Sequence, residues 1–155
     1  AITVTSGSTY NDAVVLGADT TFTSTNNITF NSTVNSDTAD TKRNLILTNG
    51  TGQSIFNDIV GTTSLADITL NSSATFNAAV TANNLTIAGN KTATVKDDVT
   101  IASNITLNNN STLAVINTAA ITIAGTIVEN GGSASNSMLE LSCAKKRSES
   151  CWMKE

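Results

Sequence analysis

Residues 56–80 read FNDIVGTTSLADITLNSSATFNAAV, and the two ends of this stretch are alike. Each end carries a phenylalanine, an asparagine, two variable residues and a valine. The first copy is Phe56-Asn-Asp-Ile-Val60 and the second, twenty residues later, is Phe76-Asn-Ala-Ala-Val80. Between them lies Ile68-Thr-Leu70, and this alternation of apolar and polar residues is typical of a half-buried β-strand. The stretch therefore predicts one turn of a repeating β structure.

The same five-residue pattern recurs along most of the chain. Two further clear copies are Tyr10-Asn-Asp-Ala-Val14 and Phe30-Asn-Ser-Thr-Val34, and weaker copies begin at Val95 and Val115. The leading residues are spaced by 20, 26, 20, 19 and 20 residues. The single long step contains SDTADTKR (Ser36 to Arg43), which we interpret as a loop inserted into an otherwise regular coil.

Recurrence of whole units at a fixed spacing favours a β-solenoid over a sandwich or barrel, because only stacked coils require successive units to look alike. Stacking places like residues above one another. We therefore expect the aromatic residues to fill one row of the core and the asparagines to form a ladder. The predicted fold is all-β, a parallel β-helix (β-solenoid) with coils of about 20 residues, and it covers residues 1–136.

The composition agrees with stacked coils. The chain has 155 residues, with 27 threonines, 20 asparagines and no proline. Charged residues make up 13% of it, whereas ordinary domains have about 25%. Like charges stacked about 4.8 Å apart would repel, which threonine and asparagine avoid. Proline would remove a backbone donor that each coil needs to bond to its neighbour.

Residues 137–155 form a compositionally distinct tail. Both cysteines, Cys143 and Cys151, both methionines and the only tryptophan lie there. Three interpretations remain open: a cap on the end of the rod, a disordered end and a non-native end. The two cysteines are close enough in sequence to form a small disulfide loop in an exported protein. Because the chain begins at Ala1 without a methionine or a signal peptide, we expect a processed or excised piece.

The composition also argues against several functions. Without histidine, Ser/His/Asp and Cys/His catalysis and imidazole metal ligands are excluded. A net charge of −4 argues against nucleic acid, and no apolar run approaches the 18 or so residues of a membrane span. Neighbouring Asp97 and Asp98 would point to opposite faces of a strand, and no D-x-D-x-D-G calcium motif is present. We expect no catalytic, cofactor-binding or metal-ligating residues, no nucleic-acid partner and no membrane insertion.

The segment from Thr9 to Phe76 resembles the repeat segments of very large filamentous-haemagglutinin-like surface proteins, and the resemblance extends over roughly residues 9–130. It is carried by the Phe/Tyr-Asn-x-x-Val repeat and the apolar-Thr-apolar segments between its copies. The resemblance implies a right-handed parallel β-helix within an exported bacterial exoprotein, outside the cell or at the bacterial cell surface. It further implies an outer-membrane secretion partner and a role as an adhesin or surface fibre.

We expect a non-catalytic structural or adhesive segment, a rigid stalk that displays loops to glycans or proteins of a host or neighbouring cell. The candidate contact loop is the insert with Asp37, Asp40, Lys42 and Arg43, because it interrupts the coil and concentrates charge. One alternative is a β-helical carbohydrate-active enzyme, which needs converging carboxylates, or a carbohydrate-binding module. A second is an ice-binding protein, whose threonines would have to form one regular array, whereas here their runs fall at uneven intervals.

Overall fold

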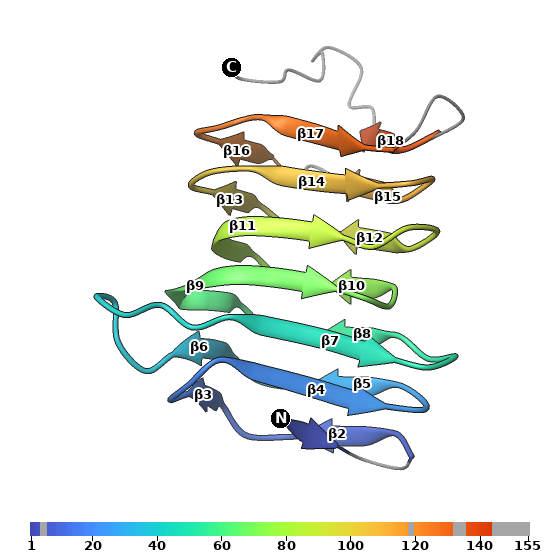
Figure 1. Ribbon diagram of the computed structural model, residues 1–155. Helices are drawn as coiled ribbons and strands as arrows, with labels where there is room; N and C mark the ends of the chain where they lie inside the picture. The colour runs from blue at the N-terminus through green and yellow to red at the C-terminus, as the bar shows by residue number, and fades with distance from the viewer. Residues whose placement is uncertain (4–5, 118–119, 132–135, 144–155) are drawn as a thin grey trace.

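The computed structural model describes residues 1–3, 6–117, 120–131 and 136–143. Within these residues the chain forms eighteen β-strands and no helix, and neighbouring strands pair in parallel. The chain winds as a right-handed coil that rises steadily from the N-terminus (Figure 1). The prediction of an all-β parallel solenoid with coils of about 20 residues is therefore confirmed.

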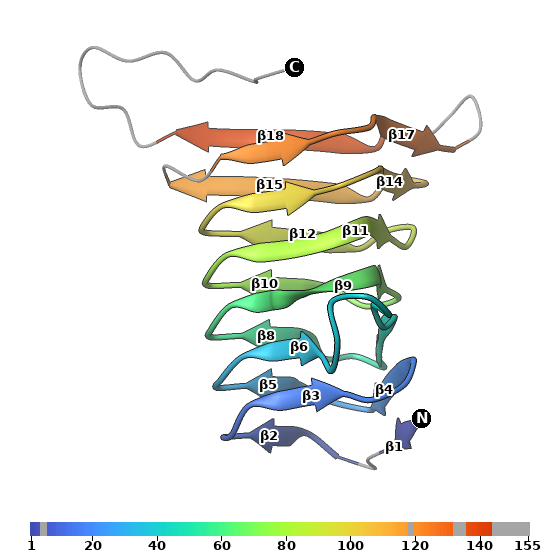
Figure 2. The same cartoon turned by 90° about the vertical axis from the view of Figure 1, so that its left-hand side faces the viewer.

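Each coil presents three faces, and strands of one face stack on one another along the solenoid (Figures 1 and 2). Face 1 is a seven-stranded sheet of β2 (Ser8–Tyr10), β5 (Ile28–Phe30), β8 (Ser54–Phe56), β10 (Ala74–Phe76), β12 (Thr92–Val95), β15 (Thr112–Asn117) and β18 (Met138–Cys143). Face 2 holds β3 (Val14–Leu16), β6 (Val34–Ser36), the first parts of β9 (Val60–Leu70) and β11 (Val80–Ile87), β13 (Val99–Ile101) and β16 (Ile121–Ile123). Face 3 holds β1 (Ile2–Thr3), β4 (Thr20–Ser24), β7 (Leu45–Asn49), the second parts of β9 and β11, β14 (Ile105–Asn108) and β17 (Ile127–Asn130). Because β9 and β11 run through the corner between faces 2 and 3, these two faces form one continuous sheet.

The repeat found in the sequence corresponds to the pairing register of the strands of face 1. Its leading residues, from Tyr10 through Phe56 and Phe76 to Val115, are partners of one another in successive strands. The long step before Phe56 leaves this row intact, because most of the extra residues lie in the connection between β6 and β7. Spacing in the sequence therefore predicts which residues stack.

The aromatic row lies at the centre of the core. Phe30 stacks on Phe56 with ring centroids 4.8 Å apart, and Phe56 stacks on Phe76 at 4.7 Å, with an interplanar angle of 5° in both pairs. Tyr10 extends the stack below Phe30, and Phe22 of face 3 meets these two rings edge-on. All four phenylalanines are at most 1% exposed. The predicted aromatic row is confirmed, and each stacked pair contributes about 0.5–1.5 kcal/mol beyond the burial of its surface.

The asparagines that follow the aromatic residues form the predicted ladder at the corner between faces 1 and 2. Nδ2 of Asn31 donates to Oδ1 of Asn11 at 2.8 Å, Asn57 donates to Asn31 at 2.8 Å, and Asn77 donates to Asn57 at 2.7 Å. An amide suits this position because it donates to one copy of itself and accepts from the next. A repeated carboxylate at the same spacing would instead repel its copies.

The stacking continues beyond Asn136, where the composition changes. β18 pairs with β15 over its whole length, so the first residues of the predicted tail add a further strand to face 1. On face 3, exposed Glu129 is the register partner of buried Leu107, so the row of core residues ends in β17. The remainder of the tail, and with it any pairing of Cys143 with Cys151, lies outside the described residues.

Candidate functional site

The insert predicted as a contact loop lies at the corner between faces 2 and 3. Residues 37–44 connect β6 to β7, whereas only residues 17–19 connect β3 to β4 in the preceding coil. The loop protrudes from the side of the stack (Figures 1 and 2). The strands on either side of it keep their register with both neighbours. The solenoid therefore accommodates the insert without a change in stacking.

Two of the four predicted contact residues pair with each other. Nε of Arg43 donates to Oδ1 of Asp37 at 2.8 Å, and Nη2 donates to Oδ2 at 2.9 Å. This bidentate geometry is the one in which a guanidinium binds a carboxylate most strongly. The hydrogen bonds with Arg43 lower the pKa of the Asp37 carboxyl, and they raise the pKa of Arg43. The side chain of Asp37 is 30% exposed and that of Arg43 is 23% exposed, so solvent screens the attraction between their charges.

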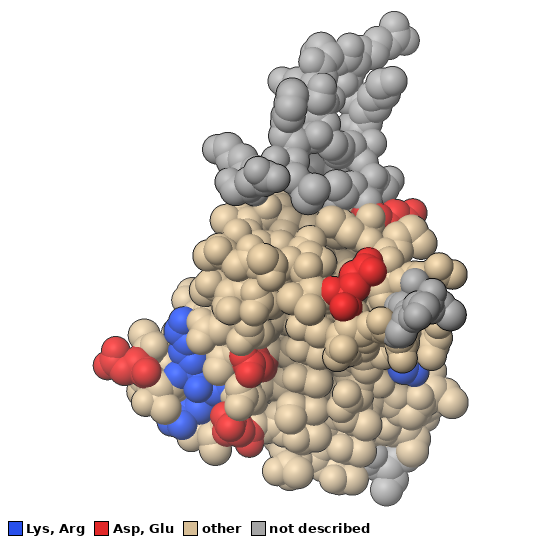
Figure 3. All heavy atoms as spheres, turned by 45° about the horizontal axis from the view of Figure 1, so that its top comes forward, with Lys and Arg blue, Asp and Glu red and all other residues tan. Residues whose placement is uncertain are grey.

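The other two predicted residues have different surroundings. Nζ of Lys42 donates to Oδ1 of Asn83 at 2.7 Å, and Asn83 lies in β11, two coils further along the stack. Asp40 is exposed. Figure 3 shows basic and acidic side chains gathered on the side where the insert protrudes, on a surface that is otherwise mostly uncharged. The structure therefore joins Asp37 to Arg43, ties Lys42 to the wall of the solenoid and leaves Asp40 in solvent.

We expect Asp37→Asn to make the stability of the fold less sensitive to acid. The pKa of Asp37 is lower in the folded protein than in the unfolded chain. The pair therefore contributes stability above the unfolded pKa of about 4, and this contribution is lost as pH falls through the folded pKa. Urea unfolding at pH 7 and at about pH 2.5 measures the loss, which should be larger for wild type than for D37N.

Asp40→Asn is the matched control, because it removes a carboxylate from the same loop without breaking the pair. Its loss of stability on acidification should equal that of wild type. If D37N lost as much stability as wild type and D40N, the proposed contribution of the ion pair would be refuted.

A second ladder, absent from the sequence interpretation, runs along the corner at which the insert ends. Asn44 donates from its backbone N–H and its Nδ2 to the carboxylate of Asp19, at 2.9 Å in both cases. Oδ1 of Asn44 accepts the backbone N–H of Asp67 at 3.1 Å, and Asp67 accepts Nδ2 of Asn84 at 2.7 Å. Oδ1 of Asn84 accepts the N–H of Asn104 at 3.1 Å. The sequence signal for this ladder is an Asn or Asp directly before an apolar-Thr-apolar segment of face 3, as at Asp67, Asn84 and Asn104.

Asp97 and Asp98, the carboxylates considered for catalysis or calcium binding, accept backbone hydrogen bonds at a turn. Asp97 and Asp98 lie exposed after β12. Oδ1 of Asp97 accepts the N–H of Asp98 at 2.8 Å, and Oδ1 of Asp98 accepts the N–H of Ala120 at 2.9 Å. In the part of the chain that the structure describes, no three acidic or cysteine side chains gather where they could hold a metal ion. No observation at this turn favours a carbohydrate-active enzyme.

The outward-facing threonines are more regular than their runs in the sequence indicate. On face 1, Thr9, Thr29, Thr75 and Thr94 occupy one outward row, interrupted by Ile55. The row is one residue wide, because most strands of this face are only three residues long. A broad array of threonines is therefore not formed on face 1.

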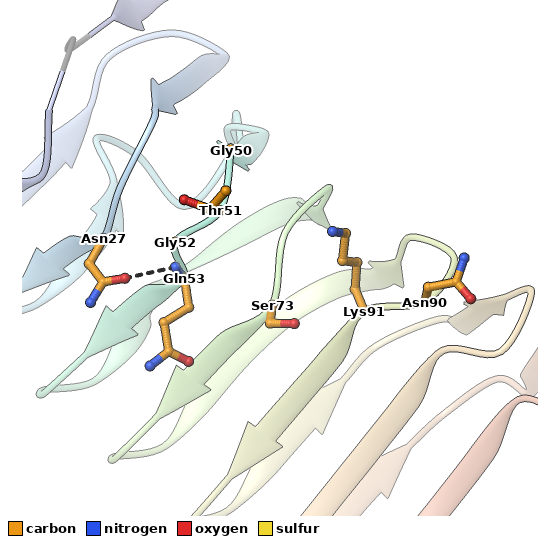
Figure 4. A pocket seen from close by; sticks show the side chains of 8 residues that line it. All are labelled: Asn27, Gly50, Thr51, Gly52, Gln53, Ser73, Asn90 and Lys91. Carbon is orange, nitrogen blue, oxygen red and sulfur yellow. Dashed lines mark hydrogen bonds between the residues drawn. The ribbon is translucent and has the colours of Figure 1, made fainter.

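A groove lies at the corner between faces 3 and 1, on a different edge from the insert. It has a volume of about 570 Å³ and is lined from four successive turns by Asn27, Gly50, Thr51, Gly52, Gln53, Ser73, Asn90 and Lys91 (Figure 4). Only three residues, 71–73, separate the core positions Leu70 and Ala74 at this corner. Six residues occupy the same place in the preceding coil and five in the following one. The short turn therefore forms the floor of the groove and the longer turns form its walls.

No protein-family model matches the chain, and no curated protein sequence or solved structure matches it either. Among the described residues, no helix is long and apolar enough to cross a membrane. The stacked coils, the insert and the groove are thus the features from which a function is inferred.

Proposed function

We propose that the chain is a rigid, non-catalytic stalk segment of a secreted or cell-surface bacterial protein. In this role the stacked coils form a spacer of fixed length, and the insert contacts glycans or proteins of a host or neighbouring cell. The observation that carries the proposal is the continuous parallel pairing of strands from coil to coil in both sheets. The aromatic row runs through the centre of this stack, and asparagine ladders follow two of its corners.

Such a stack supports a stalk because it resists bending and slipping. Each inner strand is hydrogen-bonded to the coil before it and the coil after it, and the rise is fixed at about 4.8 Å per coil. A slip by one residue would exchange the buried and the outward side chains of a strand. On face 1 that exchange would bring Phe56 and Phe76 to the surface.

The insert supports the role of a displayed loop. It adds five residues to one corner, yet the strands β4, β7 and β9 that flank it stay in register. Its charges stand out on a surface with few others. The resemblance to filamentous-haemagglutinin-like repeats is the ground on which we add export, a bacterial cell-surface location and an outer-membrane secretion partner.

Shortening the insert tests its role in contact. We replace residues 37–43 by Gly-Ala, which copies the preceding coil and lets Asn44 keep its place beside Asp19. Beads coated with wild-type protein should adhere to monolayers of epithelial cells or to bacterial cells, and beads coated with the variant should not. The circular dichroism spectrum should remain that of a β protein, because the register of the flanking strands does not depend on the loop.

Lys96→Ala serves as the control for a general loss of positive charge, since Lys96 is exposed and lies outside the insert. It should leave adhesion unchanged. Adhesion that survives the Gly-Ala replacement would refute the contact role of the insert, as would wild-type beads that bind no better than bare beads.

A further inference from the structure

We propose that the groove at the corner between faces 3 and 1 binds a carboxylated saccharide. This inference goes beyond the proposed stalk, because the groove and the insert lie on different edges and neither requires the other. The lining consists of amides, hydroxyls, glycine backbone and one lysine, and it contains no Asp or Glu. A volume of about 570 Å³ is within the range of about 300–1,000 Å³ that small-ligand sites have.

Three side-chain acceptors of the lining are already occupied by hydrogen bonds between coils. Oδ1 of Asn27 accepts the backbone N–H of Gln53 at 3.0 Å, the bond drawn dashed in Figure 4. Oγ of Ser73 accepts a backbone N–H of β12 at 3.1 Å. Oδ1 of Asn90 accepts Nδ2 of Asn110 at 3.4 Å. Hydrogen bonds between the stacked coils therefore occupy these three side-chain oxygens of the groove.

The donors of the lining remain available. Nδ2 of Asn27, Nε2 of Gln53, Nδ2 of Asn90 and Nζ of Lys91 make no hydrogen bond to any described residue. Figure 4 shows Asn27 and Gln53 toward one end of the groove, Asn90 and Lys91 toward the other, and Ser73 between them. The groove therefore presents an excess of donors together with one positive charge.

A saccharide that carries a carboxylate matches this arrangement. Its hydroxyl and ring oxygens accept hydrogen bonds from the amide groups, and its carboxylate accepts a charge-assisted bond from Lys91. The groove is open and crosses four successive turns, about 14 Å along the stack, so it suits an elongated ligand. An acidic peptide fits less well, because the lining offers one cation and no apolar pocket for side chains.

The wall formed by residues 50–53 is ordered before any ligand binds. An added Cβ at Gly52 would collide with the backbone of Asn26, so this turn lies directly against the turn of the preceding coil. The N–H of Thr51 donates to the carbonyl oxygen of Thr25 at 3.1 Å. Groups that are already held in place lose little entropy on binding, which favours affinity in a site with few charges.

Calorimetric titration with trigalacturonate, a trimer of carboxylated sugars, tests the proposal against the neutral trimer maltotriose. Trigalacturonate should bind with a dissociation constant of about 1 mM or lower, and maltotriose should bind about tenfold more weakly. Lys91→Gln should weaken the binding of trigalacturonate about tenfold, because the charge-assisted bond is lost. Added salt should weaken binding to wild type more than binding to K91Q.

Lys96→Gln is the matched control, since it removes an exposed lysine outside the groove and should leave the affinity unchanged. The protein with the Gly-Ala replacement of the insert should bind trigalacturonate as wild type does, so the groove and the contact role of the insert are tested separately. No binding at about 10 mM trigalacturonate would overturn the proposal. Equal affinity in wild type and K91Q, or tighter binding of hexaglutamate than of trigalacturonate, would overturn it as well.

Discussion

Gly61→Ala should destabilise the folded protein by about 4 kcal/mol. Gly61 has a φ of 86°, in the left-handed region that disfavours residues with a Cβ. A Cβ at this position would also collide with the carbonyl oxygen of Thr81 in the next coil. To relieve the collision, β9 would have to move away from β11 and lose backbone hydrogen bonds to it. Urea unfolding followed by circular dichroism measures the change in free energy.

Gly17→Ala is the matched control, because its added Cβ meets nothing closer than Oδ2 of Asp37 at 4.0 Å. Gly17 is also not among the described residues with positive φ. Its effect should stay within about 1 kcal/mol, and a small stabilisation is expected from the reduced freedom of the unfolded chain. Equal destabilisation by the two substitutions would contradict the close approach of β9 and β11 at Gly61.

The importance of Gly61 follows from an irregularity in β9. Val60 pairs with Val80 and Leu65 pairs with Ala82, so four residues of β9 lie opposite a single residue of β11. Extra residues on one strand bend it and increase its local twist. In β9 they carry the chain around the corner between faces 2 and 3 while both ends of the strand stay paired.

Phe56→Ala should destabilise the fold by about 4 kcal/mol, near the middle of the range for a buried phenylalanine. The Phe56 ring is 1% exposed and lies between Phe30 and Phe76, so its removal breaks two stacked pairs and leaves a cavity. Rings on both sides are fixed by their own coils, which limits collapse of the cavity. The midpoint of urea unfolding should therefore fall markedly, with little change in slope.

Ile55→Thr provides the control on the same strand. Ile55 points outward between Thr29 and Thr75, so threonine restores the residue type of its neighbours in the row. The change in stability should be within about 0.5 kcal/mol, as for most surface substitutions. If Phe56→Ala were as mild as Ile55→Thr, the stacked aromatic core would be disproved.

Face 1 could be predicted from the sequence because its residues recur at an almost constant spacing. Tyr10, Phe30 and Phe56 are large and rare, so their recurrence is easy to detect, and the asparagine after each one identifies the ladder. The long step before Phe56 predicts an inserted loop at residues 36–43, and in the structure the connection comprises residues 37–44, because Ser36 is still the last residue of β6.

The strand segments of face 3 could be predicted from their apolar-Thr-apolar alternation, but the shapes of the corners and the groove could not be predicted, because lengths at individual corners compensate one another. The extra residues of β9 lengthen one corner of its coil, and the short turn 71–73 shortens the next, so Phe76 still follows Phe56 by twenty residues. Because the spacing from Phe56 to Phe76 stays at twenty residues, the sequence repeat gives no sign of the short turn 71–73 that forms the floor of the groove. The partners of Lys42 and Asp37 likewise depend on how the insert folds back, which the spacing does not encode.

Distances along the outward row of face 1 test the rigid stack most directly. Spin labels are attached to cysteines introduced at Thr9 and Thr75 or at Thr9 and Thr94, after Cys143 and Cys151 are replaced by serine. These pairs are three and four coils apart in register. Pulsed electron paramagnetic resonance should give narrow distance distributions whose means differ by one rise of about 4.8 Å, since the backbone positions are about 14 and 19 Å apart. Broad distributions, or a difference much larger than one rise, would contradict a rigid solenoid stalk.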